Sequence, residues 1–154
     1  MTRRPGTSSG PPVSDPRPAW DPYFLGIAQA VSARGDCTRA QVGAVMVKPR
    51  AGLPTQVGAG YNGAPPGVPG CLSEGACPRG RLTAEECAPN SDYSNCTADH
   101  AERNCIRLTP VDHRQGATLY VTREPCPSCR TLITAARIGR VVWPEGGWIP
   151  PGSG

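Results

Sequence analysis

The apolar residues of the chain recur at spacings that predict three helices. The first helix would follow Asp21 and Pro22, a capping residue and a proline at the first helical position, and Gly35 offers it a stop. Apolar positions of this segment recur at helical spacing: Phe24, Ile27, Ala28 and Val31. Two further helices are predicted at about residues 99–108 and 125–138.

Short runs rich in β-branched residues predict four strands. Residues 42–47 and 56–61 flank a turn-forming segment at 49–54, and this pattern is typical of a hairpin. Residues 118–122 and 141–143 are two more compact apolar runs of this kind. The resulting order is helix, hairpin, helix, strand, helix, strand, which predicts a sheet covered by helices in an α/β layered domain.

The composition divides the chain into three parts, the second of which contains an insert. Residues 1–19 are rich in Pro, Ser, Gly and Arg and predict a disordered arm. The layered domain occupies residues 20–144, and within it residues 63–97 form a Cys-rich insert without any period, so something must order it. The Pro- and Gly-rich residues 145–154 predict a loose C-terminal tail.

The charge of the chain argues against a long polyanion as partner. Of the formal net charge of +4, the predicted arm holds +2, because it carries three arginines and one aspartate. The remaining charge forms no basic stripe of the kind that tracks nucleic acid. A small anionic substrate needs only one or two well-placed arginines.

The hydropathy pattern predicts no contact with membranes. No apolar stretch approaches the roughly 20 residues of a membrane span, and the first residues lack the apolar segment of a secretory signal. We therefore expect a cytoplasmic protein, in which thiols stay reduced. The eight cysteines are then interpreted as metal ligands or buried thiols rather than disulfides.

Two segments carry residues with metal-binding chemistry. His100 stands near the start of one predicted helix, and Cys126 and Cys129 stand one turn apart at the start of another. Helix N-termini favour negative charge and lower the pKa of a thiol. One imidazole and two thiolates leave the fourth tetrahedral position of a zinc ion open, which is typical of catalytic rather than structural zinc.

Glu102 adds a candidate acid–base catalyst. Its carboxylate is two positions from His100, close enough to reach a water molecule whose pKa zinc lowers to about 7. Such a carboxylate can accept a proton and deliver it to a leaving group. Taken alone, the C-x-x-C pair could be a redox pair or half of a structural zinc site, but the two segments together favour catalysis.

The combination H-x-E with P-C-x-x-C is the signature of zinc-dependent nucleobase deaminases. Over about residues 20–144, the chain resembles the cytidine/deoxycytidylate deaminase superfamily. The resemblance implies a three-layer αβα domain with a mixed, mostly parallel sheet of five strands, the first two antiparallel. Only four strands are predicted above, so the fifth is either missed or lies in a tail.

Within the superfamily, Cys37–Val45 and the segment G-Y-N-G at 60–63 resemble the deoxycytidylate deaminase branch. The resemblance implies that Asn62 contacts the sugar or base and that Arg39 contributes to phosphate binding. The backbone N–H of Ala101 is a further candidate for orienting the base. Glu124 departs from this branch, where an aromatic residue is common, and is typical of tRNA adenosine and riboflavin-pathway deaminases.

The remaining cysteines, histidine and arginines have less specific patterns. The insert carries four cysteines that could hold a second, structural zinc, as some relatives do, or act as redox-sensitive or buried thiols: Cys71, Cys77, Cys87 and Cys96. Two cysteines in or next to predicted elements are interpreted as core residues, although the first could join that second metal: Cys37 and Cys105. The other histidine and three arginines are interpreted as solvated surface: His113, Arg130, Arg137 and Arg140.

The expected reaction is hydrolytic loss of ammonia from C4 of a cytosine nucleotide, with dCMP giving dUMP as the best substrate hypothesis. Glu102 would protonate N3 and then the departing amine. Two alternatives stay open: a deaminase that acts on a base in tRNA or single-stranded DNA (or on another nucleoside or base), and a non-catalytic zinc-stabilised binding module. The resemblance also implies a homo-oligomer.

Overall fold

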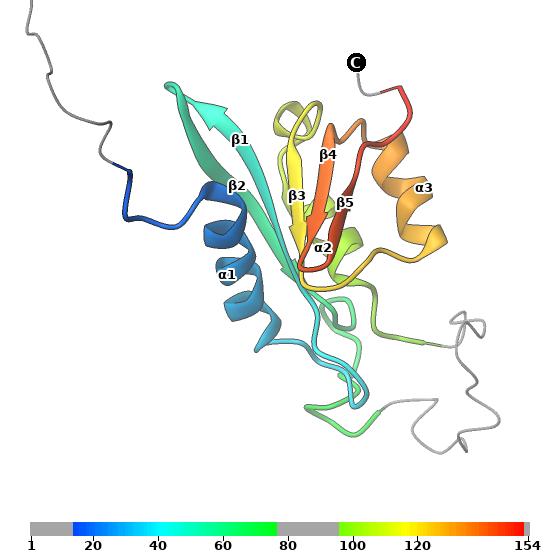
Figure 1. The fold of residues 1–154 in the computed structure, drawn as a ribbon. Helices are drawn as coiled ribbons and strands as arrows, with labels where there is room; N and C mark the ends of the chain where they lie inside the picture. Colours follow the sequence, from blue (N-terminus) through cyan, green and yellow to red (C-terminus); the bar gives the residue numbers. More distant parts are fainter. Residues whose placement is uncertain (1–13, 77–95, 153–154) are drawn as a thin grey trace, which may run out of the picture.

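The structure, a computed structural model, describes residues 14–76 and 96–152. Figure 1 shows a five-stranded sheet between helices. In chain order the elements are α1 (Trp20–Ser32), β1 (Gly43–Arg50), β2 (Leu53–Tyr61), α2 (Ala101–Leu108), η1 (Val111–His113), β3 (Thr118–Val121), α3 (Pro127–Ala135), β4 (Arg140–Trp143) and β5 (Gly146–Trp148). The three helices and four strands predicted from the sequence are all present, with ends that shift by a few residues.

The sheet is mixed, with the strand order β2-β1-β3-β4-β5. β1 pairs antiparallel with β2 and with β3, and β4 pairs antiparallel with β5. Among the described residues only β3 and β4 are parallel, joined by α3 as a crossover. The mixed α/β class is therefore confirmed, whereas the expectation of a mostly parallel sheet is wrong. The reason is that both edge strands arrive through tight hairpins, which force antiparallel pairing.

The fifth strand lies in the segment interpreted as a loose tail. β5 pairs with β4 after a turn of two residues, with Trp143 opposite Gly146 and Val141 opposite Trp148. The loose-tail interpretation of residues 145–154 is thus wrong for 146–148. Two of the three residues of this strand are glycines, which lack the β-branched pattern that predicts strands.

Successive side chains of the central strands point to opposite faces of the sheet and so belong to two different hydrophobic clusters. Ala44 and Met46 of β1 face the cluster that contains residues of α2 and α3, whereas Val45 and Val47 face the cluster that contains Phe24 of α1. β3 and β4 alternate in the same way. The helices therefore cover both faces of the sheet, α1 on one and α2 with α3 on the other (Figure 1), which confirms the three-layer αβα arrangement.

The start of α1 differs from the prediction in a way that ties the helix to the sheet. The helix begins at Trp20, so Asp21 lies in its first turn instead of capping it. The Asp21 carboxylate accepts a hydrogen bond of 2.7 Å from the hydroxyl of Tyr120 and forms an ion pair with Arg140. The hydrogen bonds from Arg140 hold the pKa of Asp21 below its ordinary value. Arg140 therefore lies in β4, where it forms this ion pair with the first turn of α1.

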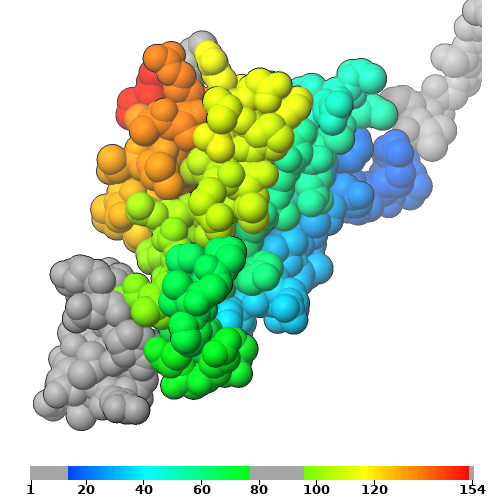
Figure 2. Space-filling view, turned by 180° about the vertical axis from the view of Figure 1, so that it is seen from behind, coloured from blue at the N-terminus to red at the C-terminus, as the bar shows by residue number. Residues whose placement is uncertain are grey.

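Helix α2 packs directly on β2 at glycines. A methyl group at Gly60 would clash with the backbone nitrogen of Cys105, so the helix lies closer to the strand than any side chain would allow. The side chain of Asn104 donates a hydrogen bond of 2.9 Å to the carbonyl of Tyr61. Beyond the strand, Gly63 and Asp99 form a β-bridge, and Figure 2 shows the segment after β2 lying beside the start of α2. These contacts fix where α2 begins.

No helix among the described residues has the length and apolar character needed to cross a membrane.

Gly60 and Gly26 provide a matched test of this packing. We expect Gly60→Ala to destabilise the fold by about 2 kcal/mol or more, because the new methyl group pushes α2 off β2. Gly26 lies in α1 with open space around it, so Gly26→Ala should stabilise the fold by about 0.5–1 kcal/mol through helix propensity. Urea unfolding measures both free energies; equal effects of the two substitutions would contradict the close approach of α2 and β2.

Candidate active site and metal centre

The candidate metal ligands stand at the starts of two neighbouring helices. His100 is the N-cap residue of α2, and Cys126 is the N-cap residue of α3, each with extended backbone angles. Cys129 follows in the first turn of α3 and is fully buried. The guanidinium of Arg103 joins the two helices, because it pairs with Asp99 at 3.1 Å and donates to the Ser128 hydroxyl at 3.2 Å.

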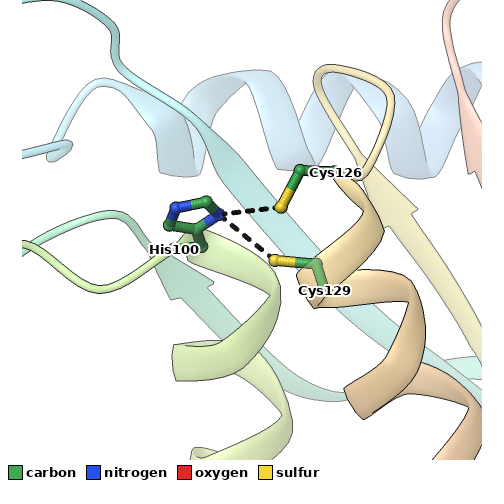
Figure 3. A group of neighbouring side chains, drawn as sticks. All are labelled: His100, Cys126 and Cys129. Atoms are coloured by element: carbon green, nitrogen blue, oxygen red, sulfur yellow. Dashed lines mark hydrogen bonds between the residues drawn. The ribbon is translucent and has the colours of Figure 1, made fainter. Parts of the chain in front are cut away.

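The donor atoms of these three residues converge. Nδ1 of His100 lies 3.2 Å from Sγ of Cys129 and 3.6 Å from Sγ of Cys126, as the dashed lines in Figure 3 mark. All three ligand atoms lie within 4.8 Å of one another, and among the described residues no fourth Cys, His, Asp or Glu joins the group. The convergence predicted from the sequence is therefore present among the described residues, and three donors of this kind would leave one position of a tetrahedral zinc ion for a water or substrate.

Glu102 lies beside this group and is buried. Only 3% of its surface is exposed, and its Oε2 is 4.0 Å from Nδ1 of His100. The residue sits in the first turn of α2, where unpaired backbone N–H groups favour a negative charge. A carboxylate in this place is close enough to act on a molecule bound at the three donors.

The chemistry of these side chains fits a divalent cation. Burial, and next the negative charge of Glu102, raise the pKa of the Cys129 thiol far above its ordinary value. A buried carboxylate next to two thiols becomes favourable when a cation such as Zn²⁺ balances their charge.

A cavity of about 640 Å³ has His100, Glu102 and Cys126 in its wall. Its size falls in the range of pockets that hold small organic ligands. Arg39 and Asn62, the two substrate-binding candidates from the sequence, also line it. The cavity thus brings together the metal ligands, the candidate acid–base residue and groups that can bind a polar substrate.

Residues 18–145 match the family described as the cytidine and deoxycytidylate deaminase zinc-binding region. The chain belongs to this family. The family match and the placement of His100, Cys126 and Cys129 together identify zinc as the metal of this deaminase.

Curated relatives of the deaminase carry one name in several organisms. This chain is 51% identical over 134 residues to the deoxycytidylate deaminase of Mycobacterium phage D29, and the alignment covers 84% of this chain and 97% of the phage protein. It is 37% identical over 129 residues to the deoxycytidylate deaminase of Schizosaccharomyces pombe, covering 82% of this chain but 37% of the yeast protein. The chain therefore spans nearly all of the phage relative and about a third of the yeast one.

Solved structures show the same fold. The dCMP deaminase from the cyanophage S-TIM5, in complex with dCMP and dUMP, superposes with a TM-score of 0.57 at 24% identity. The alignment covers 79% of this chain and 78% of that one. The apo form of the same cyanophage protein gives a TM-score of 0.55. The likeness places the deaminase in the cytidine-deaminase-like α/β fold.

In the deaminase, Asn62 fastens one wall of the cavity. Its Nδ2 donates to the carbonyl of Ala40 at 2.8 Å, and its Oδ1 accepts from the backbone N–H of Val42 at 2.9 Å. The side chain is buried, with 9% of the residue exposed. Asn62 therefore holds the 40–42 segment in place. These two bonds use the amide oxygen and one of the two amide N–H groups.

The cavity contains cations that the sequence interpretation missed. Arg123 and Arg130 both line it, together with Glu124. Arg130 was interpreted as solvated surface, yet it stacks on aromatic rings of the sheet and bonds Glu124. The only sequence signal for these two arginines was their place beside the P-C-x-x-C motif: Arg123 stands two residues before the motif, and Arg130 directly follows it.

Only two of the four cysteines of the insert lie among the described residues. Cys71 and Cys96 line the cavity, as does Cys37, whereas Cys77 and Cys87 lie outside the described residues. Cys37 is therefore at the cavity and not in the core, which corrects the core interpretation: it lies in the irregular segment after α1 and so cannot pack under the sheet. Cys105 is in the core as predicted, and burial raises its thiol pKa to about 12.

The metal centre predicts the zinc content of two variants of the deaminase. We expect Cys129→Ala to bind less than a tenth as much zinc as the wild-type chain, because two ligands cannot complete a stable site. Cys105→Ala removes a buried thiol on the same helix layer but no ligand, so it should keep one zinc per chain. Atomic absorption after gel filtration measures both; full zinc in Cys129→Ala would contradict the ligand assignment.

Proposed function

We propose that this chain is a zinc-dependent deoxycytidylate deaminase that hydrolyses dCMP to dUMP and ammonia. The single observation that carries the proposal is the convergence of His100, Cys126 and Cys129 beside the buried carboxylate of Glu102 in the wall of one cavity. The identity of 51% with the phage D29 deoxycytidylate deaminase over almost its whole length supports the choice of substrate.

The protein residues supply the proton transfers of this reaction. Zinc held by the three donors would lower the pKa of a water molecule to about 7 and so supply the nucleophile. With that nucleophile supplied, Glu102 would take up a proton and pass it to N3 of the cytosine ring. After attack at C4, Glu102 takes the remaining hydroxyl proton and delivers it to the amino group, which leaves as ammonia. Water and dCMP are consumed, and dUMP and ammonia balance the equation.

Burial of Glu102 makes this role chemically suitable. With 3% of the residue exposed, competing bulk water is excluded from the carboxylate, so its hydrogen bonds to substrate are stronger than in solvent. Oε2 of Glu102 lies 4.0 Å from Nδ1 of His100, and the group of three converging donors does not include this carboxylate. The same residue can therefore serve as base and then as acid.

The cavity wall offers groups for the rest of the nucleotide. We assign Asn62 to the sugar or base through its remaining amide N–H, and the backbone N–H of Ala101, at the start of α2, to the base. Arg39 is assigned to the 5′-phosphate, because a guanidinium forms forked bonds with phosphate oxygens. Arg123, which lines the same cavity and forms no ion pair with any described residue, is a second cation for that group.

The two alternative functions receive less support. A base within tRNA or single-stranded DNA would require a basic track, and the body of the chain carries a net charge of only +2 outside the first 19 residues. A non-catalytic zinc module would need a fourth protein ligand, and no fourth ligand joins the group among the described residues. A small-molecule nucleotide remains the substrate class that charge and cavity both favour.

Three further expectations stay predictions. We propose that the chain forms a homo-oligomer and works in the cytoplasm, as the resemblance and the sequence pattern led us to expect. A second, structural zinc at the insert also stays a prediction, since two of its four candidate ligands, Cys77 and Cys87, lie outside the described residues.

Glu102→Gln tests the acid–base assignment. The amide keeps the shape of the side chain but cannot accept a proton, so we expect kcat for dCMP to fall by about 10²- to 10⁴-fold with zinc content unchanged. Glu145, an exposed carboxylate in the turn between β4 and β5, provides the control, and Glu145→Gln should keep the wild-type rate. Turnover near the wild-type value in Glu102→Gln would remove this residue from the mechanism.

A comparison of dCMP with deoxycytidine tests the phosphate assignment. We expect Arg39→Ala to lower kcat/KM for dCMP by about 10- to 100-fold while leaving that for deoxycytidine unchanged, because only dCMP offers the charged acceptor. Arg34 lies on the same segment outside the cavity wall, so Arg34→Ala should change neither value. Equal use of dCMP and deoxycytidine by the wild-type enzyme would exclude phosphate recognition.

A further inference from the structure

The C-terminal strand contacts a side chain of the active-site cavity. The guanidinium carbon of Arg130 lies 4.9 Å from the ring centroid of Trp148 in β5 and 5.7 Å from that of Trp143 in β4. Both distances are within the range of cation–π attraction. Arg130 itself is on α3 and lines the cavity next to Cys126. The strand mistaken for a loose tail therefore reaches the wall of the active site through one arginine.

Arg130 bonds the loop that presents the ligand Cys126. Its Nε donates to the carbonyl of Pro125 at 3.2 Å, and its backbone N–H donates to the carbonyl of Cys126 at 3.0 Å. A third bond, from Nη2 to Glu124 Oε1, measures 2.8 Å. The bond to Cys126 is the first backbone bond of α3, which any residue except proline would form here, so the contribution of the arginine side chain is the bond to the peptide group before Cys126.

These contacts differ in the stabilisation they provide. The ion pair with Glu124 is exposed, with 62% of that carboxylate side chain accessible, and exposed pairs contribute little. The bond to the Pro125 carbonyl involves a side chain that is mostly covered and kept in one orientation by the two indole rings. The thiol of Cys126 caps no helix N–H and lies 3.6 Å from Nδ1 of His100, while the Arg130 side chain holds the peptide group that precedes Cys126.

We propose that Arg130 is a positioning residue for the zinc ligand Cys126 and that Trp148 of β5 keeps Arg130 in place. The proposal rests on the zinc site of the proposed function but not on its substrate. Partners that orient metal ligands commonly change metal affinity or activity by 10- to 100-fold when they are removed. The C-terminal strand is, on this basis, part of the metal centre.

The experiment measures how fast each full-length variant releases zinc to an excess of a colorimetric chelator. Arg130→Ala should release zinc about tenfold faster than the wild type, and Trp148→Ala about threefold faster, since it loses the stacking alone. Trp148→Phe keeps an aromatic face and should stay within twofold of the wild type. Arg130→Lys keeps the charge but cannot form the same fork, so its rate should fall between those of Arg130→Ala and the wild type.

Arg140→Ala is the matched control for general loss of stability. Arg140 forms an ion pair with Asp21 on the α1 face of the sheet, so this variant loses an arginine–carboxylate contact without touching the cavity. It should lower the unfolding midpoint yet release zinc at the wild-type rate. Substitution with Co²⁺ adds a spectroscopic readout, because the thiolate-to-metal absorption of the Arg130 and Trp148 alanine variants should shift or weaken while that of Arg140→Ala should not.

Several results would overturn the proposal. Wild-type release rates and cobalt spectra in both Arg130→Ala and Trp148→Ala would exclude a positioning role, and so would equally fast release from Arg140→Ala. If Arg130→Ala does not fold, Arg130→Lys and Trp148→Ala carry the same comparison. A wild-type chain that holds no zinc would instead overturn the metal site itself, and intact zinc release behaviour with no dCMP turnover would overturn only the substrate.

Discussion

Helices α2 and α3 pack on the same face of the sheet with their first turns next to each other, and the chemistry of the site depends on this packing. The glycines of β2 allow α2 to lie directly on the strand, and α3 crosses over between the parallel strands β3 and β4. Arg103 then bridges the two helix starts through Asp99 and Ser128. A shift of either helix along its axis would separate His100 from the two thiols, because each ligand lies at or within one turn of a helix end.

Bringing these groups together has an electrostatic cost that a cation offsets. Glu102 and Cys129 are buried beside each other, and burial together with the negative charge of Glu102 disfavours the thiolate. A divalent cation reverses this balance, since it stabilises the thiolate and the carboxylate at once. The carboxylate that raises the pKa of the Cys129 thiol is the same residue that we assign to proton transfer.

The cavity walls are held by bonds that reach across the sequence. Asn62, at the end of β2, bonds backbone atoms of Ala40 and Val42, and Asp36 accepts hydrogen bonds from the backbone of Leu72 and Ser73. The hydrogen bonds from Ser73 and Leu72 hold the pKa of Asp36 below its ordinary value. Part of the lining is thus irregular backbone at 40–42 that Asn62 holds, and another part is the loop before α3, which Arg130 contacts. Neither part is a regular element, so both need such partners to stay in place.

The amino-acid sequence by itself determined the local elements and the identity of the zinc ligands. The periodicity placed α1 and α2 closely, and the fixed spacing within H-x-E and P-C-x-x-C indicated one metal and one acid–base residue, because those spacings are short enough for local geometry to set which side chains share a direction. Each motif depends only on residues within about one helical turn, but the prediction of a single metal site also depended on finding both motifs, whose ligands His100 and Cys126 are 26 positions apart.

Only the tertiary structure decided which distant residues meet. Asp21 pairs with Arg140 instead of capping its helix. Residues 146–148 form a strand although their composition favours a loop. The side chain of Arg130, predicted to be solvated, stacks on Trp148. The contacts of Asp21 and Arg130 join residues separated by many positions, whereas β5 pairs with the neighbouring β4 across a two-residue turn. In each case the contact outweighed a weak local preference. Such contacts exist only after the helices and strands have packed, and no periodicity within a short window of sequence contains them.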